Sequence, residues 1–338
     1  MSAVRSGLFS LSGAIYKVLI GLAGLAIFGR IIPVDQHGIY EFVLAIHTIV
    51  LPFLDFGLLP AYLKIDKVDK EVDSVFFTLN VIIGIFLAVI LVVLAPAIAY
   101  WQELPEMNYY ILAYAFIVMV ISIGSQPSSQ LIKQKRFKEI AIIDIVASSI
   151  ALILGVVFAM WEWAVWALLL RFIIDVFVKT CMQFLRVKPK YYWVDLETIK
   201  KYWKSIVFGA EISINRIISG LTNATDRFLV KEFYGQGVST EQFTVLGQYG
   251  KAANVTSKAD LIRNALTTPA LSYLTALGTE HSRKYYFPVT QLFFFATGLP
   301  ILFFVVYGDF FVVLLMGKNW EQAGQFARFL GFYGAGLV

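Results

Sequence analysis

The chain has 338 residues, of which 59% are hydrophobic and only 15% are charged, with a formal net charge of +5. Soluble domains carry about 25% charged residues, so this composition, with a mean hydropathy of +0.73, excludes a water-soluble globular protein. The single cysteine, Cys181, excludes an intramolecular disulfide and a cysteine-ligated metal cluster. The three histidines show no metal-ligand spacing and no paired nucleophile, so we expect no metal, no cofactor and no catalytic site.

Apolar stretches long enough to cross a bilayer follow one another along the whole chain. A membrane span needs about 20 apolar residues, and windows of that length predict ten helical spans, at 8–32, 38–63, 74–100, 109–131, 139–160, 163–185, 204–230, 243–275, 285–307 and 319–338. The first is too long for the apolar core of a signal peptide and has no small-residue cleavage site, so we expect it to remain as a span. The connections are short, so any activity is expected among the helices or at their ends. The predicted fold is an all-α polytopic membrane protein.

The basic residues sort onto one side of the predicted membrane. Sixteen Lys and Arg residues fall on the side of the N-terminus, whereas Arg30 and Lys231 fall on the opposite side. Because Lys and Arg accumulate in cytoplasmic loops, we expect a cytoplasmic N-terminus. The positive net charge is therefore interpreted as a topology signal, and nucleic acid is not an expected partner.

Two segments share a pattern at an offset of 209 residues. The span at 38–63 begins Gly38-Ile39-Tyr40 and ends Pro60-Ala61, and the span at 243–275 contains Gly247-Gln248-Tyr249 and Pro269-Ala270. Coincidental helix-end chemistry is the alternative explanation. A real repeat predicts two lobes with the substrate site between them: a six-helix lobe over 1–195 and a truncated four-helix lobe over 196–338.

Charged side chains inside the predicted spans mark the candidate site, because an ionisable group in the bilayer centre costs about 2.5–3.5 kcal/mol or more. Lys17 lies midway along the first span in a stripe of small residues, and it either faces an aqueous cavity or snorkels from a tight helix contact. Polar residues share one helical face in each of two later spans: Glu211, Asn215, Ser219, Thr222 and Asp226 in the first, and Gly247, Lys251, Asn254 and Lys258 in the second. We favour a water-lined cavity over packed ion pairs, since desolvation offsets most of the attraction in a buried pair.

Two other groups of charges are expected to have simpler roles. Arg171, Asp175 and Lys179 are spaced four residues apart, so they are predicted to neutralise one another along one helix face. Asp55 is either a proton or sodium carboxylate or the partner of Lys17 or of a helix terminus.

The charge balance predicts an anionic ligand. The candidate substrate-binding residues carry six positive charges, and the candidate ion-coupling residues within the same spans carry three negative ones. A phosphate or pyrophosphate group suits such a set, because Arg and Lys bind its oxygens. The predicted substrate-binding residues are Lys17, Arg216, Arg227, Lys251, Asn254, Lys258 and Arg263, and the predicted ion-coupling residues are Asp55, Glu211, Asp226 and Asp260.

Several motifs, in order along the chain, resemble the polysaccharide transporter (O-antigen and exopolysaccharide flippase) family of the multidrug/oligosaccharidyl-lipid/polysaccharide exporter superfamily. They are Phe28–Ile32, His37–Glu41 and Asp55–Leu58, then Gln126–Ser128 with Lys135–Ile140, then Asn223–Arg227 with Leu246–Tyr249, and finally Leu314–Trp320. The resemblance implies a multi-pass protein of the bacterial inner membrane that flips an oligosaccharide on undecaprenyl pyrophosphate by alternating access. It also implies membrane lipids and sugar-polymer biosynthesis proteins as partners.

Other functions stay open as alternatives. An ion-coupled drug or toxin exporter of the same superfamily handles cationic substrates, which the excess of cavity cations disfavours. An inactive truncated fragment is a second alternative. A membrane-embedded sugar-polymer enzyme is the least favoured, because the predicted outer loops are short.

Overall fold

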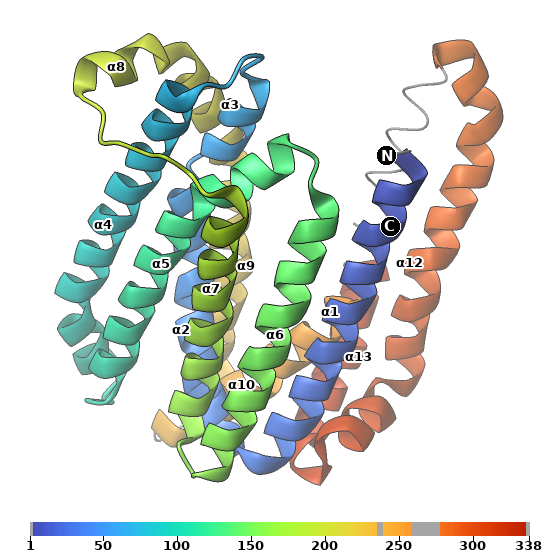
Figure 1. Cartoon of the computed structure of the whole chain (residues 1–338). Helices are drawn as coiled ribbons and strands as arrows, with labels where there is room; N and C mark the ends of the chain where they lie inside the picture. The colour runs from blue at the N-terminus through green and yellow to red at the C-terminus, as the bar shows by residue number, and fades with distance from the viewer. Residues whose placement is uncertain (1–2, 235–238, 259–277, 336–338) are drawn as a thin grey trace.

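The computed structural model describes residues 3–234, 239–258 and 278–335, and this part of the chain is helical, with no strand. The helices, shown in Figure 1, are α1 (Ala3–Ile31), α2 (Val34–Asp55), α3 (Leu58–Lys64), α4 (Lys70–Trp101), α5 (Met107–Lys133), α6 (Phe137–Met160), α7 (Ala164–Val187), α8 (Leu196–Lys201), α9 (Trp203–Tyr234), α10 (Ser239–Thr256), α12 (Gly278–Met316), the 3-10 helix η1 (Lys318–Trp320) and α13 (Glu321–Ala335). Each of the ten predicted spans overlaps a helix. The prediction of an all-α polytopic membrane protein is confirmed.

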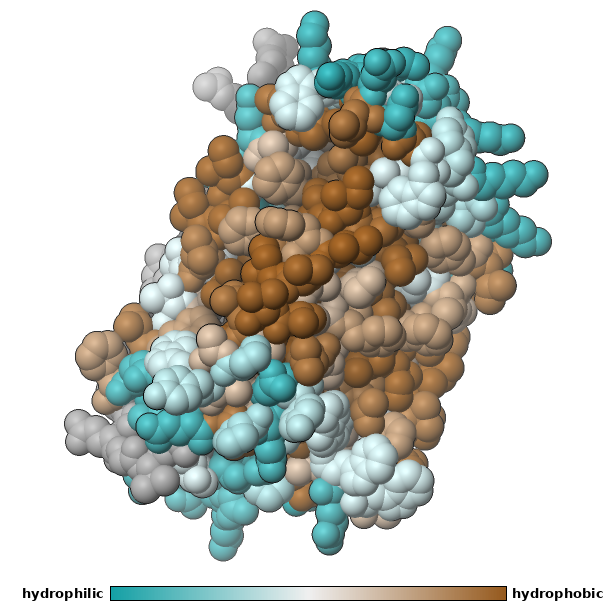
Figure 2. Space-filling view, turned by 90° about the vertical axis from the view of Figure 1, so that its left-hand side faces the viewer, coloured by the Kyte–Doolittle hydropathy of each residue, from teal (hydrophilic) through white to brown (hydrophobic). Residues whose placement is uncertain are grey.

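The surface of the helix bundle is that of a membrane protein. Within the described residues, the helical stretches 34–64, α4, α5 and α6 are long and apolar enough to cross a bilayer, and the window of highest hydropathy in α4 averages 3.2. Large apolar side chains of α4 point outward, among them Phe86 and Val93 with 63% and 70% of their surface exposed. Figure 2 shows the resulting hydrophobic band across the middle of one face, with hydrophilic residues at both ends. Helices α7 and α9 carry more charged residues than α4, α5 or α6.

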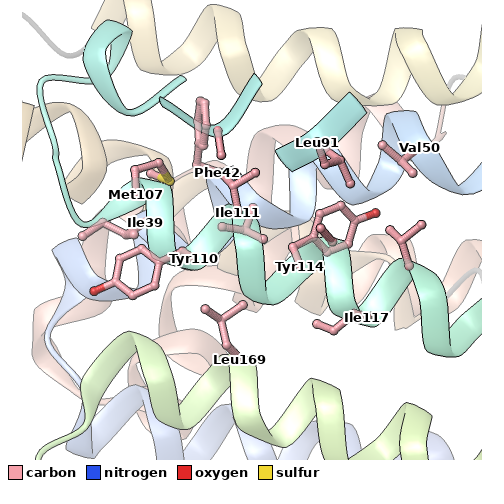
Figure 3. Packing of buried hydrophobic residues seen from close by; sticks show 14 of the residues in the cluster. Ile39, Phe42, Val50, Leu91, Met107, Tyr110, Ile111, Tyr114, Ile117 and Leu169 are labelled. Carbon is pink, nitrogen blue, oxygen red and sulfur yellow. The ribbon is translucent and has the colours of Figure 1, made fainter. Parts of the chain in front are cut away.

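The bundle is organised around α2. Helices α4 and α5 pack side by side, α7 packs on α5 and α6, and α1 packs on α6, while α2 lies against α9 and α10. The core between α2, α4, α5 and α7 is apolar, and Figure 3 shows Ile111, Tyr114 and Ile117 of α5 at its centre. All three are fully buried. This packing fixes one side of α2 and leaves its other side to meet α10.

The second predicted span is not one continuous helix, contrary to expectation. The chain breaks after Asp55, where Phe56 and Gly57 both adopt left-handed backbone conformations with φ of 36° and 69°. A Cβ on Gly57 would overlap the carbonyl group of Gly209 in α9, and a Cβ on Gly209 would overlap that of Gly57. The two glycines therefore allow α9 to cross the chain at the break.

The contact between α2 and α10 is reciprocal. A Cβ on Gly38 would overlap the carbonyl oxygen of Phe243, and a Cβ on Gly247 would overlap the carbonyl oxygen of Val34. Residues 34 and 243, like 38 and 247, differ by the repeat offset of 209. Equivalent residues exchange contacts in this way across a two-fold axis. The division of the chain into lobes at 195/196 stays a prediction, with which this contact is consistent.

Basic loops gather at one end of the bundle, which we call the basic end. It holds the α3–α4, α5–α6 and α7–α9 connections and lies at the top of Figure 1 with the N-terminus. The α7–α9 connection includes α8, a short helix absent from the predicted spans. Asp195 caps it by accepting hydrogen bonds from Thr198, and these bonds hold the pKa of the Asp195 carboxyl below its ordinary value.

Candidate functional site: a cationic cavity between four helices

A cavity of about 120 Å³ lies where α1, α2, α7 and α10 meet. Its polar lining comes from His37 and Tyr40 of α2, Arg171 of α7, and Lys251, Asn254 and Lys258 at the α10 end of the wall. The apolar remainder includes Phe28, Leu44 and Leu168. A space of this size holds a few water molecules or one small polar group, and it is too small for a sugar chain.

A buried ion pair joins the two repeat helices beside this cavity. Lys251 Nζ donates to Glu41 Oε1 at 2.8 Å, and Asn254 Nδ2 donates to the same oxygen at 3.2 Å. The Glu41 side chain has no exposed surface, and that of Lys251 has 5%. The second carboxylate oxygen of Glu41 has no hydrogen-bond partner within the described residues. Such a pair is expensive to bury, and buried polar atoms are normally satisfied, so this arrangement points to a functional role.

Two further cations line the cavity without a carboxylate partner among the described residues. The Arg171 guanidinium lies over the Phe28 ring at 5.2 Å, and Lys258 lies across the cavity from it. Glycines of α1 make room for both head groups. A Cβ on Gly24 would lie 3.1 Å from Arg171 Nη2, and a Cβ on Gly21 would lie 3.4 Å from Lys258 Nζ. The small-residue stripe of the first span therefore accommodates cations from α7 and α10.

The ion-pair ladder predicted for Arg171, Asp175 and Lys179 of α7 forms only between Asp175 and Lys179. Lys179 pairs with Asp175 at 2.6 Å and lies 3.6 Å from Asp144 of α6, and Ser148 donates to Asp175. Arg171 is left to face the cavity. The described lining of the cavity therefore holds three cations, Arg171, Lys251 and Lys258, and no carboxylate, while Glu41 binds Lys251 beside it.

The remaining predicted site residues are distributed differently. Arg216 donates to Asp55 at the helix break, and this pair is not part of the cavity wall. Asp226 accepts a hydrogen bond from Tyr249 at 2.6 Å, so it links α9 to α10, with Arg227 half-buried beside it. Glu211 is exposed on α9.

Three predicted site residues are not described. Asp260 and Arg263 lie in 259–277, outside the described residues. Lys17 lies on α1, but its side chain is also outside the description.

Sequence reasoning missed Glu41 and Arg171. Glu41 lies only about two turns from the start of α2, close enough to the helix end to be passed over as an interfacial residue. The sequence feature that could have identified Glu41 is an acidic residue inside an apolar span, three residues after Gly38. Arg171 was assigned to its own helix because its spacing to Asp175 suited an internal pair.

Comparisons with known proteins match nearly the whole chain. Residues 27–325 match the family described as polysaccharide biosynthesis protein. The chain is 20% identical to a membrane protein in the cps region of Klebsiella pneumoniae, over 95% of this chain and 65% of that protein. It is 24% identical to the lipopolysaccharide biosynthesis protein WzxC of Escherichia coli, over 90% of this chain and 61% of that protein.

A further relative comes from a Gram-positive bacterium. The teichuronic acid biosynthesis protein TuaB of Bacillus subtilis is 23% identical over 83% of this chain and 57% of its own length. The chain thus spans between 57% and 65% of the length of these three relatives. No solved structure matches it significantly. Because the family pattern extends over the cavity helices α2, α7 and α10, this multi-pass membrane protein belongs to the polysaccharide biosynthesis protein family.

Proposed function

We propose that the protein moves a glycan carried on a lipid pyrophosphate across the bacterial inner membrane. The observation that carries the proposal is the cavity whose described lining includes Arg171, Lys251 and Lys258 and no carboxylate, with Glu41 bound to Lys251 beside it. A pyrophosphate offers several anionic oxygens, which match an Arg fork and two Lys point charges. Two of the relatives carry names of polysaccharide biosynthesis proteins, which supports a glycan as the cargo.

The size of the cavity indicates that only one part of the substrate binds in it. About 120 Å³ admits phosphate oxygens but no oligosaccharide, so we propose that the head group binds here while the glycan occupies space that opens between two lobes. The reciprocal α2–α10 contact closes the bundle at the end opposite the basic end. With the basic end in the cytoplasm, this is the outward side, and alternating access would require α2 and α10 to separate there.

Glu41 is the carboxylate best placed to couple binding to that separation. It holds Lys251 and Asn254 across the α2–α10 contact, and a pyrophosphate would compete with it for Lys251. We propose that the entering anion takes Lys251 from Glu41, which removes the ion pair that holds α2 to α10. Of the other described candidates, Asp55 and Asp226 already have partners outside the cavity, and Glu211 is exposed on α9.

The proposal is tested by transport in liposomes. Protein reconstituted with a fluorescent prenyl-pyrophosphate oligosaccharide should move the lipid between leaflets, and Lys251→Ala combined with Lys258→Ala should lower the rate at least about tenfold, the loss of roughly 1.4 kcal/mol of binding. Lys231→Gln is the matched control, because Lys231 is equally buried but binds Gln242 away from the cavity. Binding of the same lipid in nanodiscs separates recognition from movement. Unchanged binding and transport in the double variant would refute the assignment.

A further inference from the structure

A second, larger pocket lies at the end of the bundle opposite the basic end. Its volume is about 730 Å³, within the usual range for small-molecule sites. It is built where α5 and α7 begin and α2 makes its first turn, so three helices that also enclose the apolar core form its wall. Its polar and aromatic lining is Gln36, Glu106, Tyr109, Glu162, Trp163 and Trp166.

The aromatic side chains of this pocket are held in fixed positions but keep exposed faces. Trp166 meets the ring of Tyr110 edge to face at 5.2 Å, and Trp163 stacks on Phe158 at 5.3 Å with an interplanar angle of 11°. Trp163 and Trp166 nevertheless expose 48% and 36% of their surface. These rings are supported from behind and open toward a ligand.

The acidic groups of the pocket, Glu106 and Glu162, make few hydrogen bonds with other described residues. Tyr110 Oη donates to Glu106 Oε2 at 3.2 Å, and Glu106 does not cap its helix through its side chain. Glu162 has no hydrogen-bond or ion-pair partner in the described part of the chain. None of the described residues that line the pocket is Lys or Arg. The pocket therefore offers carboxylate acceptors and repels anions.

We propose that this pocket binds an uncharged segment of a glycan chain. A pyranose has a C–H face that packs on an aromatic ring and a rim of hydroxyl groups that donate to carboxylates, and the Gln36 amide can both donate and accept. An anionic sugar or a pyrophosphate is excluded by Glu106 and Glu162. A belt of Trp and Tyr at the membrane interface is common, but such a belt requires neither carboxylates nor a cavity shared by three helices.

The inference rests on the proposed function only in taking a glycan as the cargo, and it can fail or succeed separately. The cationic cavity binds the head group of the carrier lipid, whereas this pocket would hold sugar units at the opposite, outward end. Binding there would keep the glycan at the outward end of the protein while the head group crosses the membrane.

The pocket is tested by fluorine NMR on protein labelled with 5-fluorotryptophan in phosphatidylcholine nanodiscs. The chain has seven Trp residues, and single Trp→Phe variants assign their resonances. Neutral trisaccharides (maltotriose, cellotriose, mannotriose and chitotriose) are titrated separately, with trigalacturonate and phosphoethanolamine as charged probes. At least one neutral trisaccharide should shift the signals of Trp163 and Trp166, whereas Trp320, buried against α1, and Trp193 at the basic end should not move.

Two variants distinguish binding from misfolding. Glu106→Gln and Glu162→Gln keep the side-chain shape, and each should weaken the trisaccharide response about tenfold while leaving the dispersion of the other Trp signals and the binding of the prenyl-pyrophosphate lipid unchanged. Loss of the trisaccharide response with intact lipid binding supports the pocket. A response to phosphoethanolamine alone, to trigalacturonate as strongly as to neutral sugars, or to no probe at all would overturn the inference. So would a trisaccharide response that survives in both variants.

Discussion

Replacing Lys251 by methionine should destabilise the protein far more than its loss of contacts suggests. The pair with Glu41 has a 2.8 Å separation and side chains that are 5% and 0% exposed. At an effective dielectric constant near 20, its gross attraction is about 6 kcal/mol, most of which offsets desolvation. Lys251→Met leaves a buried carboxylate with only Asn254 as a partner, so we expect a loss of about 3–5 kcal/mol in the free energy of unfolding. The double variant Glu41→Gln, Lys251→Met should recover most of that loss.

The free energy of unfolding is measured by titrating SDS into mixed micelles that contain each variant, and the four values form a double-mutant cycle. Lys201→Met serves as the control, because the Lys201–Glu71 pair has a comparable 3.3 Å separation but exposes 61% and 35% of its side chains. An exposed pair contributes about 0–1 kcal/mol. The reasoning is refuted if Lys251→Met costs no more than Lys201→Met, or if the effects of the two single changes at 41 and 251 simply add. Either result would mean that the Glu41–Lys251 pair is not buried away from water.

Three further predictions concern the contacts that frame the site. Gly38→Ala should abolish recovery of monodisperse protein in detergent gel filtration, because its Cβ would overlap a carbonyl of α10, whereas Gly298→Ala, with open space around it, should be recovered normally. Trp320→Phe should lower the free energy of unfolding by about 1–3 kcal/mol in the SDS titration, since it leaves the Gly29 carbonyl without its 2.7 Å buried hydrogen bond. Because hydrogen bonds from the first turn of α8 depress the pKa of Asp195, its capping is fully present above the ordinary pKa of 3.8 and is lost as pH falls through the lower folded-state value. Hydrogen exchange corrected for intrinsic rates should therefore show α8 protection falling toward pH 3, and Asp195→Asn should remove that dependence.

Hydropathy located the spans because lipid imposes a simple requirement, about 20 apolar residues with an internally bonded backbone. It could not locate the break between α2 and α3. Phe56 and Gly57 lie in an apolar run, and their left-handed conformations arise from the close approach of α9 at Gly209. That approach joins residues about 150 positions apart, and no local pattern reports it.

The same distinction separates the site residues that could be predicted from those that could not. Lys251 and Asn254 share a face of α10, and Lys258 follows just after the end of that helix, so helical spacing was enough to predict that the three line one cavity. Arg171 could not be placed by spacing, because its expected partner Asp175 is held by Lys179 and by Ser148 of α6. Whether Asp175 pairs with Arg171 or with Lys179 depends on the packing of α6 against α7. The sequence of α7 alone contains no information about that packing.

The predicted repeat would account for the α2–α10 contact, and the departures from it would account for the site. At the offset of 209, Lys251, Asn254 and Lys258 correspond to Phe42, Ala45 and Ile49, which are apolar, so α2 supplies no cation at the positions equivalent to Lys251 and Lys258. Glu41 corresponds to Gly250, and a Cβ on that glycine would clash with the Glu41 carboxyl group. Close to a two-fold axis equivalent side chains compete for one space, so only one helix can carry a carboxylate there. A symmetric pair of helices would have placed like charges face to face. The loss of symmetry at these four positions instead produces one acid that holds α2 to α10 and an excess of positive charge around it, which is the arrangement an anion could enter by displacing the acid.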